Sequence, residues 1–364
     1  MAAAAPIRRV TARAFRIPTD APEADGTIAW DATTLVLVEV TAADATGLGY
    51  SYADASAAEI VTGLLAHKIE GQDAFDIPKL WIDMVRAVRN VGWRGVAACA
   101  ISAVDVALWD LKAHLLDVPL VTLLGGERNK VPIYGSGGFT SYSIAQLQKQ
   151  LSGWVERNGC RFVKMKIGTV PEDDFGRVKA ARESIGDAKL FVDANGAYTR
   201  KQALDFADGF SALGVTWFEE PVSSDDLEGL RFIRERAPAS MEIAAGEYGY
   251  DQFYFRRMLE AQAVDVLQAD ATRCGGYTGF LKAAALADAW SLPLSAHCAP
   301  ALHLPVCCAA PRVRHIEWFH DHVRIEHLVF DGAPHPEGGA IEPDRSRPGH
   351  GLAFKDKDAA RLAA

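Results

Sequence analysis

Three short apolar segments of this chain each end in a carboxylate, and the spacing between the three acids is nearly even. The segments are Phe191-Val192-Asp193, Trp217-Phe218-Glu219 and Ala245-Gly246-Glu247, so the acids lie 26 and 28 residues apart. A strand and the helix after it take up about 30 residues in an α/β barrel, so these acids are expected at the ends of neighbouring parallel strands. The spacing restricts the fold to one that returns the chain to the same edge after each helix.

Carboxylates at one height on neighbouring strands repel one another unless a cation binds between them. No Cys or His accompanies the three acids, and a ligand set of oxygens alone favours a hard divalent metal such as Mg2+. The alternative is that each acid only caps the helix that follows it. Three acids in register favour the metal site, with Asp193, Glu219 and Glu247 as its ligands.

The alternation of strands and amphipathic helices begins at Val131 and predicts a closed parallel barrel. With 364 residues the chain is long enough for a barrel of about 250 residues and a smaller domain. The gap from Ala296 to His315 holds three prolines and leaves room for only a short helix, which predicts an irregular closure. The expected strands are 131–135, 162–167, 190–192, 216–218, 242–245, 264–268, 292–296 and 315–318.

The first third of the chain has a different pattern, which predicts an α+β unit. Residues 10–16, 34–41 and 47–52 are expected to form an antiparallel sheet, and residues 18–26 a polar loop with two prolines. Helices are expected at 57–68, 77–88 and 96–116. The tail 331–364 is rich in Gly and Pro and is expected to return over the first unit as a largely irregular segment.

Composition excludes several classes of protein. The chain has 38 basic and 47 acidic residues, a net charge of −9, which argues against nucleic-acid binding. No stretch approaches the roughly 18 apolar residues of a membrane helix, and the opening six residues are too short for a secretory signal, so a cytoplasmic location is expected. The six cysteines form no CxxC pair and are interpreted as small core residues.

Two lysines, Lys164 and Lys166, lie two residues apart in the strand predicted at 162–167. Alternate residues of a strand point to the same side, so both amines are expected to face the barrel interior. Repulsion between them, and a nearby metal, would lower a lysine pKa from about 10.4 toward the range of a base. The alternative, a surface pair on an edge strand, does not fit a closed barrel, which has no edge.

Three further candidates follow the last predicted strands. Asp270 and His297 lie at consecutive strand ends, where the carboxylate would fix the tautomer of the imidazole and raise its basicity; a helix cap and a core histidine are the alternative. Glu317 stands between Ile316 and Trp318, so we expect it to be partly desolvated and to stay protonated as a hydrogen-bond donor. His303 fits no metal motif and is interpreted as structural.

Together these residues resemble the enolase superfamily, in the subgroup named for mandelate racemase. The resemblance covers nearly the whole chain: Lys-x-Lys, then Asp, Glu and Glu on the next three strands, Asp and His on the sixth and seventh, and Glu on the eighth. It implies a modified TIM barrel (β/α)7β with an N-terminal α+β capping domain completed by the C-terminal tail. The corresponding segments are 1–125, 126–320 and 321–364.

The resemblance also implies roles. One Mg2+ would bind Asp193, Glu219 and Glu247, while Asn195 and Glu220 would orient ligands or substrate. Lys166, tuned by Lys164, and His297, tuned by Asp270, would be opposed acid/base groups, and Glu317 would donate to an enediolate oxygen. Homo-oligomers are usual in the resembled family.

The shared chemistry of the resembled family is removal of the proton next to a carboxylate through an enediolate. The resemblance favours dehydration of an acid sugar, an aldonate or aldarate, to a 2-keto-3-deoxy acid. Racemisation, epimerisation or lactone cycloisomerisation by the same Lys and His is the alternative, and a barrel that only binds a ligand is a remote one. The expected partner is a small-molecule carboxylate.

Substrate contacts are expected in the cap loops at residues 20–30 and 50–54, which include Trp30 and Tyr50 and whose polar residues suit a hydroxyl-rich ligand, and at Ser136 at the end of the first barrel strand. A flexible glycine-rich turn is the alternative for Ser136. The run Cys274-Gly275-Gly276-Tyr277-Thr278-Gly279 makes a phosphate or dinucleotide site conceivable, but it lacks the GxGxxG order, so no NAD-dependent activity is expected.

Overall fold

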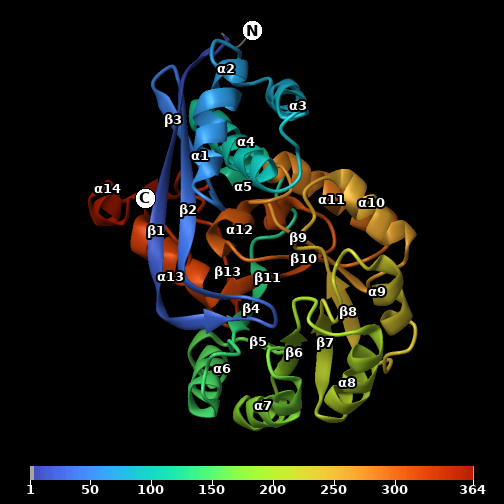
Figure 1. The fold of residues 1–364 in the computed structure, drawn as a ribbon. Coiled ribbons are helices and arrows are strands. Elements are labelled where there is room, and N and C mark those ends of the chain that lie inside the picture. The colour runs from blue at the N-terminus through green and yellow to red at the C-terminus, as the bar shows by residue number, and fades with distance from the viewer. Residues whose placement is uncertain (1–3, 364) are drawn as a thin grey trace.

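The computed structural model describes residues 4–363, and eight of its parallel strands form a closed barrel (Figure 1). Residues 1–3 and 364, the ends of the first and last predicted segments, lie outside the described residues. Each strand pairs with the next, and β11 pairs back onto β4, which closes the barrel and confirms the predicted fold. The strands are β4 (Val131–Gly137), β5 (Phe162–Lys166), β6 (Lys189–Asp193), β7 (Val215–Glu219), β8 (Glu242–Ala245), β9 (Val266–Ala269), β10 (Leu294–Ala296) and β11 (Val313–Phe319).

Seven helices connect these strands, as a (β/α)7β barrel requires. The last connection contains α12 (Pro300–Ala309), a ten-residue helix with Pro305 inside it. The predicted irregularity is present beside it, because β10 has only three residues and its pairing with β11 shifts register after Leu294. The other connecting helices are α6 (Ile144–Asn158), α7 (Pro171–Ser184), α8 (Arg200–Ala212), α9 (Leu227–Arg234), α10 (Gln252–Glu260) and α11 (Gly276–Ala289), and α13 (His320–Val329) follows β11.

The cap consists of an antiparallel sheet and a group of helices at the start of the chain (Figure 1). Its central helix is α4 (Val96–Leu115), which is buried along nearly all its length because the cap sheet covers one side and the barrel helix α11 the other. The strands are β1 (Ile7–Ala24), β2 (Ala29–Ala42) and β3 (Ala45–Tyr52); the other helices are α1 (Ser56–Ile60), the π-helix η1 (Val61–Leu65), α2 (Ala66–Ile69), α3 (Ile77–Ala87) and α5 (Leu120–Leu123).

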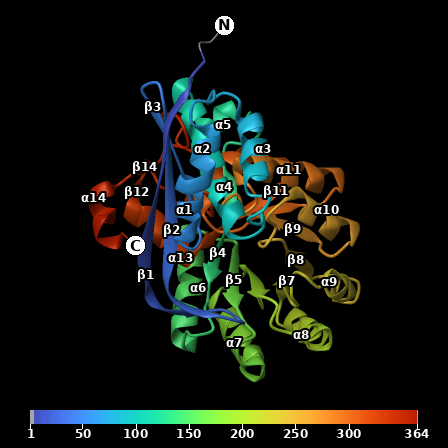
Figure 2. The same cartoon turned by 45° about the horizontal axis from the view of Figure 1, so that its top comes forward.

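The polar loop predicted at residues 18–26 is wrong. Strand β1 continues to Ala24 and pairs with β2 almost to its end, so only residues 25–28 form the turn. The tip of this β1–β2 arm is held by the barrel loops, because the amide of Thr140 donates to the Ala24 carbonyl at 2.9 Å. Both views show the arm reaching from the cap down beside β4 and α6 (Figures 1 and 2). The two prolines of residues 18–24 predict a loop, but pairing with β2 and the bond to the loop after β4 keep these residues extended.

Gly26, in the turn of the arm, approaches the barrel closely. A Cβ atom there would lie 2.3 Å from the Ala194 carbonyl oxygen and 2.6 Å from that of Ile167. Only glycine allows the turn to rest directly on the ends of β5 and β6. The arm therefore forms one wall over the barrel mouth.

The barrel interior has two layers of inward-facing side chains. Tyr134, Phe191 and Trp217 form a fully packed aromatic layer with Phe162 and His315. Because alternate residues of a strand face the same side, the residues two positions further along point into the next layer up. Those residues are Ser136, Lys164, Asp193, Glu219 and Glu317. The aromatic layer is thus the floor beneath the charged groups.

The tail forms short pieces of structure, in keeping with the predicted irregular segment. Its strands β12 (Phe330–Asp331), β13 (Ala340–Ile341) and β14 (Ala353–Phe354) have two residues each. The last elements are α14 (Asp356–Ala359) and the 3-10 turn η2 (Ala360–Leu362). His350 bonds to the cap at the Leu48 carbonyl, 2.8 Å away. The tail also pairs β13 with β4, so it contacts the barrel as well as the cap.

Within residues 4–363, no helix has the combination of length and apolar character that a bilayer crossing requires.

Candidate active site

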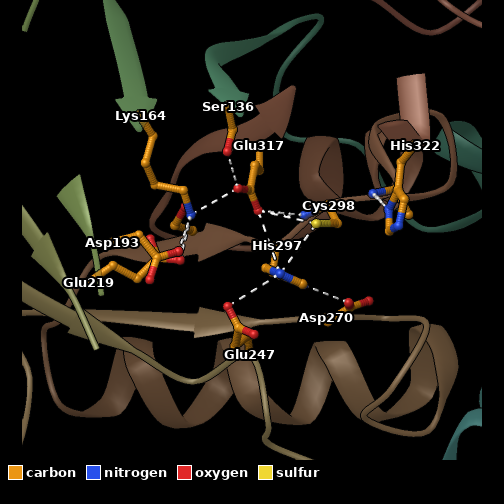
Figure 3. Close-up of polar contacts among 12 residues, drawn as sticks. Ser136, Lys164, Asp193, Glu219, Glu247, Asp270, His297, Cys298, Glu317 and His322 are labelled. Atoms are coloured by element: carbon orange, nitrogen blue, oxygen red, sulfur yellow. Dashed lines mark hydrogen bonds and ion pairs between the residues drawn. The ribbon is translucent and has the colours of Figure 1, made fainter. Parts of the chain in front are cut away.

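The three acids that end β6, end β7 and follow β8 converge in the structure (Figure 3). Asp193, Glu219 and Glu247 are all buried, and one oxygen from each lies within 4.8 Å of the others. Register explains the first two, because Asp193 and Glu219 are directly paired across β6 and β7. Burial and the charge of Asp193 raise the pKa of Glu219 well above its ordinary value, against the opposing effect of Lys164. The cluster therefore strongly favours added positive charge.

Gly246 brings Glu247 into this cluster. Its φ of 139° is strained for residues with a side chain, and a Cβ atom there would lie 2.0 Å from the Gln268 carbonyl oxygen. The chain can turn at the end of β8 only because this position is glycine, and the turn aims the next residue at Asp193 and Glu219.

Replacing Gly246 with Ala is expected to destabilise the protein by about 1–3 kcal/mol and to displace Glu247, because the backbone must move to relieve the contact. Chemical denaturation and calorimetry of metal binding measure the two effects. Gly176→Ala is the matched control, since a Cβ there meets nothing within 4 Å and alanine favours the interior of α7. Equal stabilities of the two variants would contradict the assignment.

Both lysines of β5 face the barrel interior. Lys164 Nζ lies 2.5 Å from Glu219 Oε1, 2.8 Å from Glu317 Oε1 and 3.3 Å from Asp193 Oδ2, while Lys166 Nζ lies 2.6 Å from Asp193 Oδ2. Burial, the largest cause, lowers the pKa of Lys166, and so does the charge of Lys164, but the charges of Asp193, Glu247 and Glu219 together outweigh both. The pKa of Lys166 is therefore raised, whereas the sequence predicted a lowered value. The difference arises because the adjacent carboxylates, which the sequence argument did not weigh against the second lysine, contact the amines directly.

Glu317 is charged in this arrangement, which corrects the prediction that it stays protonated. Burial raises its pKa, as expected, but Lys164 and then His297 lower it by more, so the pKa lies well below the ordinary value. Its oxygens accept hydrogen bonds from Ser136 Oγ at 2.6 Å and from the Cys298 amide at 3.0 Å. Apolar neighbours in the sequence do not decide its protonation, because they point away from the lumen that its carboxylate faces.

The structure brings Asp270 and His297 together. Asp270 Oδ2 lies 2.8 Å from His297 Nδ1, and Asp270 Oδ1 accepts from the amide and hydroxyl of Thr272 at 2.7 Å each. Burial, the largest cause, raises the pKa of Asp270, but the hydrogen bond and charge of His297, with the charges of His303 and Arg273, together lower it by more, so the carboxylate stays ionised. The nearby His303 accepts from the Ala271 amide at 2.7 Å, a backbone contact that holds the strand end. The other ring nitrogen of His297 faces the cavity.

Four non-glycine residues beside these groups have a left-handed backbone. Asn195 and Glu220 follow the acids of β6 and β7 with φ of 47° and 37°, and Cys298 and Ala299 follow His297 with φ of 52° and 38°. Each such conformation costs about 1–3 kcal/mol, and stabilising contacts in the surrounding structure must offset this cost. Their grouping at three strand ends shows that the backbone is bent where side chains must enter the site.

One cavity of about 420 Å³ lies over the site, between the cap arm and the barrel mouth. Lys166, Asn195, Glu247 and His297 line it, and Trp30 lines it from the arm as the sequence predicted. Most of the remaining lining is polar or aromatic. Asp25, Tyr52 and Asp54 belong to the cap loops that the sequence predicted over the barrel mouth. The residues that the sequence interpretation missed are Thr33, Thr34, Tyr248, Arg273, Cys298, Phe319 and His322.

Arg273 and His322 are two of the missed residues, and they differ in charge. The position of Arg273, three residues after Asp270, is a signal that could have found it, and its guanidinium donates to the Glu247 carbonyl at 3.1 Å. His322 is stacked on Tyr52 with 3.5 Å between ring centroids. Burial, and next the charge of His297, lower the pKa of His322 to about 3, so it is a neutral wall of the cavity.

Three predicted substrate contacts do not line the cavity. Tyr50 is fully buried, and its hydroxyl donates to Glu326 Oε1 at 2.6 Å; Tyr52, two residues along the same strand, takes the place at the cavity. Ser136 is buried against Glu317, within β4 and not in a flexible turn. Glu220 is 1% exposed, below the cavity. The sequence predicts which face of a strand a residue lies on, but not which residues along that face reach the cavity.

Replacing Tyr50 with Phe is therefore expected to lower the free energy of unfolding by about 1–3 kcal/mol, because the buried Glu326 loses a hydrogen-bond donor. The KM for any substrate should stay close to the wild-type value. Urea denaturation and steady-state kinetics separate the two effects. A large rise in KM with unchanged stability would restore the substrate role predicted from the sequence.

Cys298 departs from the interpretation of all six cysteines as core residues. Its Sγ lies 3.2 Å from His297 Nε2 and 3.4 Å from Glu317 Oε2, at the edge of the cavity.

The glycine-rich run after Asp270 is not open to a phosphate, because the backbone amide of Gly275 donates to Ser102 Oγ at 2.8 Å and that of Thr278 donates to Asp105 at 2.9 Å. That run docks the barrel onto α4 of the cap.

A capped α/β barrel with acids, lysines and an Asp–His pair at the carboxyl ends of its strands has its site where enzymes of this fold place theirs. Two family descriptions match the chain: the N-terminal domain of mandelate racemase / muconate lactonizing enzyme at residues 10–125, and the enolase C-terminal domain-like family at residues 146–359. The chain belongs to the enolase superfamily, in the mandelate racemase and muconate lactonizing enzyme group.

Similar proteins span nearly the whole chain. A 3,6-anhydro-alpha-L-galactonate cycloisomerase of Streptomyces coelicolor is 34% identical over 98% of this chain and 99% of its own. A mandelate racemase/muconate lactonizing enzyme-like protein from Rubrobacter xylanophilus has a structure that matches with a TM-score of 0.96 and 50% identity, covering 99% of this chain and 100% of the other.

Dehydratases of acid sugars are also among the relatives. The structure of L-talarate/galactarate dehydratase from Salmonella typhimurium, liganded with Mg and L-lyxarohydroxamate, matches with a TM-score of 0.89 and 27% identity, covering 99% of this chain and 93% of the other. Dehydratases named for arabinonate, L-rhamnonate and D-gluconate are 30–33% identical over their aligned parts.

Proposed function

We propose that this protein is a Mg2+-dependent enzyme that removes the α-proton of a carboxylate substrate and dehydrates an acid sugar, an aldonate or aldarate, to a 2-keto-3-deoxy acid. The observation that carries the proposal is a cluster of three buried carboxylates placed between Lys166 and His297 at one cavity. The named dehydratases among the relatives support the reaction class.

The donor set fits magnesium. Asp193, Glu219 and Glu247 offer only oxygen, the atoms that Mg2+ prefers. Glu247 Oε2 is buried and has no hydrogen-bond partner among the residues described; it lies 3.4 Å from His297 Nε2, an ion pair only when that imidazole is protonated, so an acceptor is left for a cation. When bound, Mg2+ would supply positive charge for the oxygens of the substrate carboxylate and make its α-proton more acidic.

Lys166 and His297 are placed to move protons on two sides of a substrate. Lys166 comes from β5 and His297 from β10, and the strands carrying the three acids, β6 to β8, lie between them on one side of the barrel. Both side chains reach the cavity. We assign Lys166 to removal of one α-proton and His297, held by Asp270, to proton transfer on the other side.

The remaining site residues hold this arrangement. Lys164 and Glu317 do not line the cavity, and their contact at 2.8 Å balances charge beneath the three acids. We therefore assign Glu317 to holding Lys164, Ser136 and the Cys298 amide in place. Asn195 lines the cavity and its backbone N–H donates to Asp193 Oδ1 at 2.9 Å, so it would orient this ligand. We assign the buried Glu220 to supporting the same strand ends.

Dehydration balances without a redox partner. The bond between Cα and its hydrogen breaks, the β-hydroxyl leaves with a proton as water, and the resulting enol rearranges to the keto acid. His297 is placed to give the leaving hydroxyl its proton. The cavity also carries Asp25, Thr33, Thr34 and Asp54, which suit a substrate rich in hydroxyl groups better than an aryl group.

A panel of aldonates and aldarates with Mg2+, read by keto-acid formation, tests this proposal. The same reactions in D2O report exchange at the α-carbon. Keto acid from at least one sugar acid supports dehydration. Neither keto acid nor exchange across the panel would refute catalysis on this substrate class and favour a barrel that only binds its ligand.

A second candidate is cycloisomerisation of a lactone or anhydro-sugar acid, with racemisation or epimerisation as a variant that uses the same bases. It is favoured by one observation, the 34% identity to a cycloisomerase over nearly the full chain. In that case α-exchange should occur without release of keto acid from an open-chain sugar acid.

Three further expectations accompany the proposal. We propose a division into segments 1–125, 126–320 and 321–364, supported by the match of one family description to residues 10–125. A small-molecule carboxylate is the proposed partner, and ligands of this kind are present in similar structures. A homo-oligomer and a cytoplasmic location stay predictions; light scattering and cell fractionation would test them.

A further inference from the structure

A second cluster of metal-ligating side chains lies outside the active site, where the cap arm meets the barrel. It consists of Asp20 and Glu23 of β1 and His320, the first residue of α13, and we call it the arm site. One ligand atom of each residue lies within 4.8 Å of the others. His320 Nε2 is 3.1 Å from both carboxylate oxygens of Asp20. Two carboxylates and an imidazole thus converge from segments 300 residues apart in the chain.

An irregularity in β1 creates this convergence. Asp20 and Glu23 are three residues apart, so in a regular strand their side chains would point to opposite faces. Pro18 pairs with Ala32 and Glu23 with Trp30, so five steps along β1 span only two along β2. The extra residues bulge out of the ladder and bring both carboxylates to the same side, as bulges near functional sites commonly do.

Glu23 provides independent evidence that a ligand belongs here. Its side chain is only 1% exposed, yet its Oε1 has no hydrogen-bond partner in residues 4–363. The other oxygen, Oε2, accepts from Trp30 Nε1 at 2.9 Å, which fixes the carboxylate in place. A buried carboxylate oxygen without a partner is costly unless a proton or a cation binds it.

The charged groups around Glu23 carry an excess of negative charge, which favours binding of a cation. Glu23 is buried, which disfavours its charge, and the charges of Asp321 and Asp20 add to this effect. Arg324 opposes this effect, but its guanidinium donates to Asp321 and to the Pro18 carbonyl, so it is already engaged. Glu23, Asp20 and Asp321 thus place three carboxylates beside one arginine, Arg324, and one histidine, His320.

We propose that Asp20, Glu23 and His320 bind a first-row transition-metal dication such as Zn2+, and that this ion fastens the cap arm to the barrel. An imidazole with two carboxylates suits Zn2+ better than Mg2+, because Mg2+ prefers oxygen ligands alone. The two sites would therefore hold different metals. The triad of Asp193, Glu219 and Glu247 contains no imidazole, whereas the arm site has one; a third group, His297, Cys298 and Glu317, lies within the active site itself.

The arm site lies beside the cavity, so an ion bound there is expected to affect the cavity walls. Asp25 and Trp30 line the cavity from the arm, and Phe319 and His322 line it on either side of His320. An ion that joins Glu23 to His320 therefore joins two walls of the cavity. It is expected to reduce opening of the arm.

The decisive experiment is a crystal of the full-length protein grown with excess Mg2+ and one equivalent of Zn2+, with anomalous difference density measured on both sides of the zinc edge. A zinc peak between Asp20, Glu23 and His320 is expected. Zinc only at Asp193, Glu219 and Glu247, or only at other histidines or cysteines, would overturn the proposal.

Solution binding adds a test that does not depend on activity. In excess Mg2+, the wild-type protein should bind one equivalent of Zn2+, and Asp20→Asn and His320→Ala should bind it at least about tenfold more weakly, since loss of even an outer-shell partner has effects of that size. Asp31→Asn is the matched control, because Asp31 lies on the same arm and pairs with Arg16 instead.

Hydrogen exchange reports the effect on the arm. Zn2+ should slow amide exchange in residues 18–32 of the wild-type protein and of Asp31→Asn, but not of Asp20→Asn. Asp20 is about half exposed, so Asp20→Asn is expected to fold. Equal zinc affinity in all of these variants would mean that the arm site holds no metal and that Glu23 is neutralised by a proton.

Discussion

Replacing His297 with Asn is expected to lower kcat by about 10²- to 10⁴-fold, the usual contribution of a positioned acid or base. Asparagine can still bond to Asp270, which lies 2.8 Å from the imidazole, but it cannot carry a proton to the substrate. The measurement is kcat and KM on the best substrate from the acid-sugar panel, with circular dichroism to verify folding.

Isotope exchange makes this prediction sharper. Because Lys166 reaches the cavity from β5 and His297 from β10, each is assigned to one side of the substrate. In D2O, His297→Asn should still exchange the α-proton of a substrate that presents it to Lys166, and should lose exchange for the epimer. His67→Asn, on the exposed side of α2, is the control and should leave both rates unchanged. Loss of both exchanges in a folded variant would contradict two independent bases.

Removal of magnesium is expected to abolish turnover, and its return to restore it. Glu219→Gln should prevent that recovery, with a loss of at least about 10³-fold in kcat, because one negative ligand of the cluster disappears. Isothermal calorimetry should show Mg2+ binding to the wild-type protein and none to Glu219→Gln. Mg2+ at about 100 times its Kd adds about 2.7 kcal/mol of stability, so it should also raise the Tm of the wild type alone.

The neighbouring acid offers a matched control for this experiment. Glu220 is not one of the three acids whose oxygens converge, so a glutamine at this position removes no ligand of the cluster. Glu220→Gln is therefore expected to keep Mg2+ binding. Retained magnesium dependence and full activity in Glu219→Gln would remove the basis of the proposed function.

Much of the site could be predicted because it follows from strand periodicity. Asp193 and Glu219 end consecutive strands, and parallel pairing places such ends at one height. Lys164 and Lys166 are two residues apart, which puts both amines in the lumen whatever the rest of the fold does. The even spacing of the three acids also predicted Glu247 as a ligand, although the orientation of its side chain depends on the turn at Gly246.

Contacts between distant segments could not be predicted in this way. Residues 18–24 carry the prolines and polar residues of a loop, yet pairing with β2 and bonds to the loop after β4 keep them extended over the site. The protonation of Glu317 likewise depends on Lys164, 153 positions earlier in the chain. Tyr50 and Tyr52 are on the same face of β3, and only packing of the cap against the barrel decides which of them reaches the cavity.

The sequence by itself determined the barrel, its eight strands and the convergence of acids, lysines and the Asp–His pair, because these depend on local periods of two residues along strands and about 30 residues between them. The tertiary structure alone decided the charge states within the cluster, the lining of the cavity and the joining of β1 to α13 at the arm site. Those features depend on burial and on distances between groups that are far apart in the chain, and no local pattern contains them.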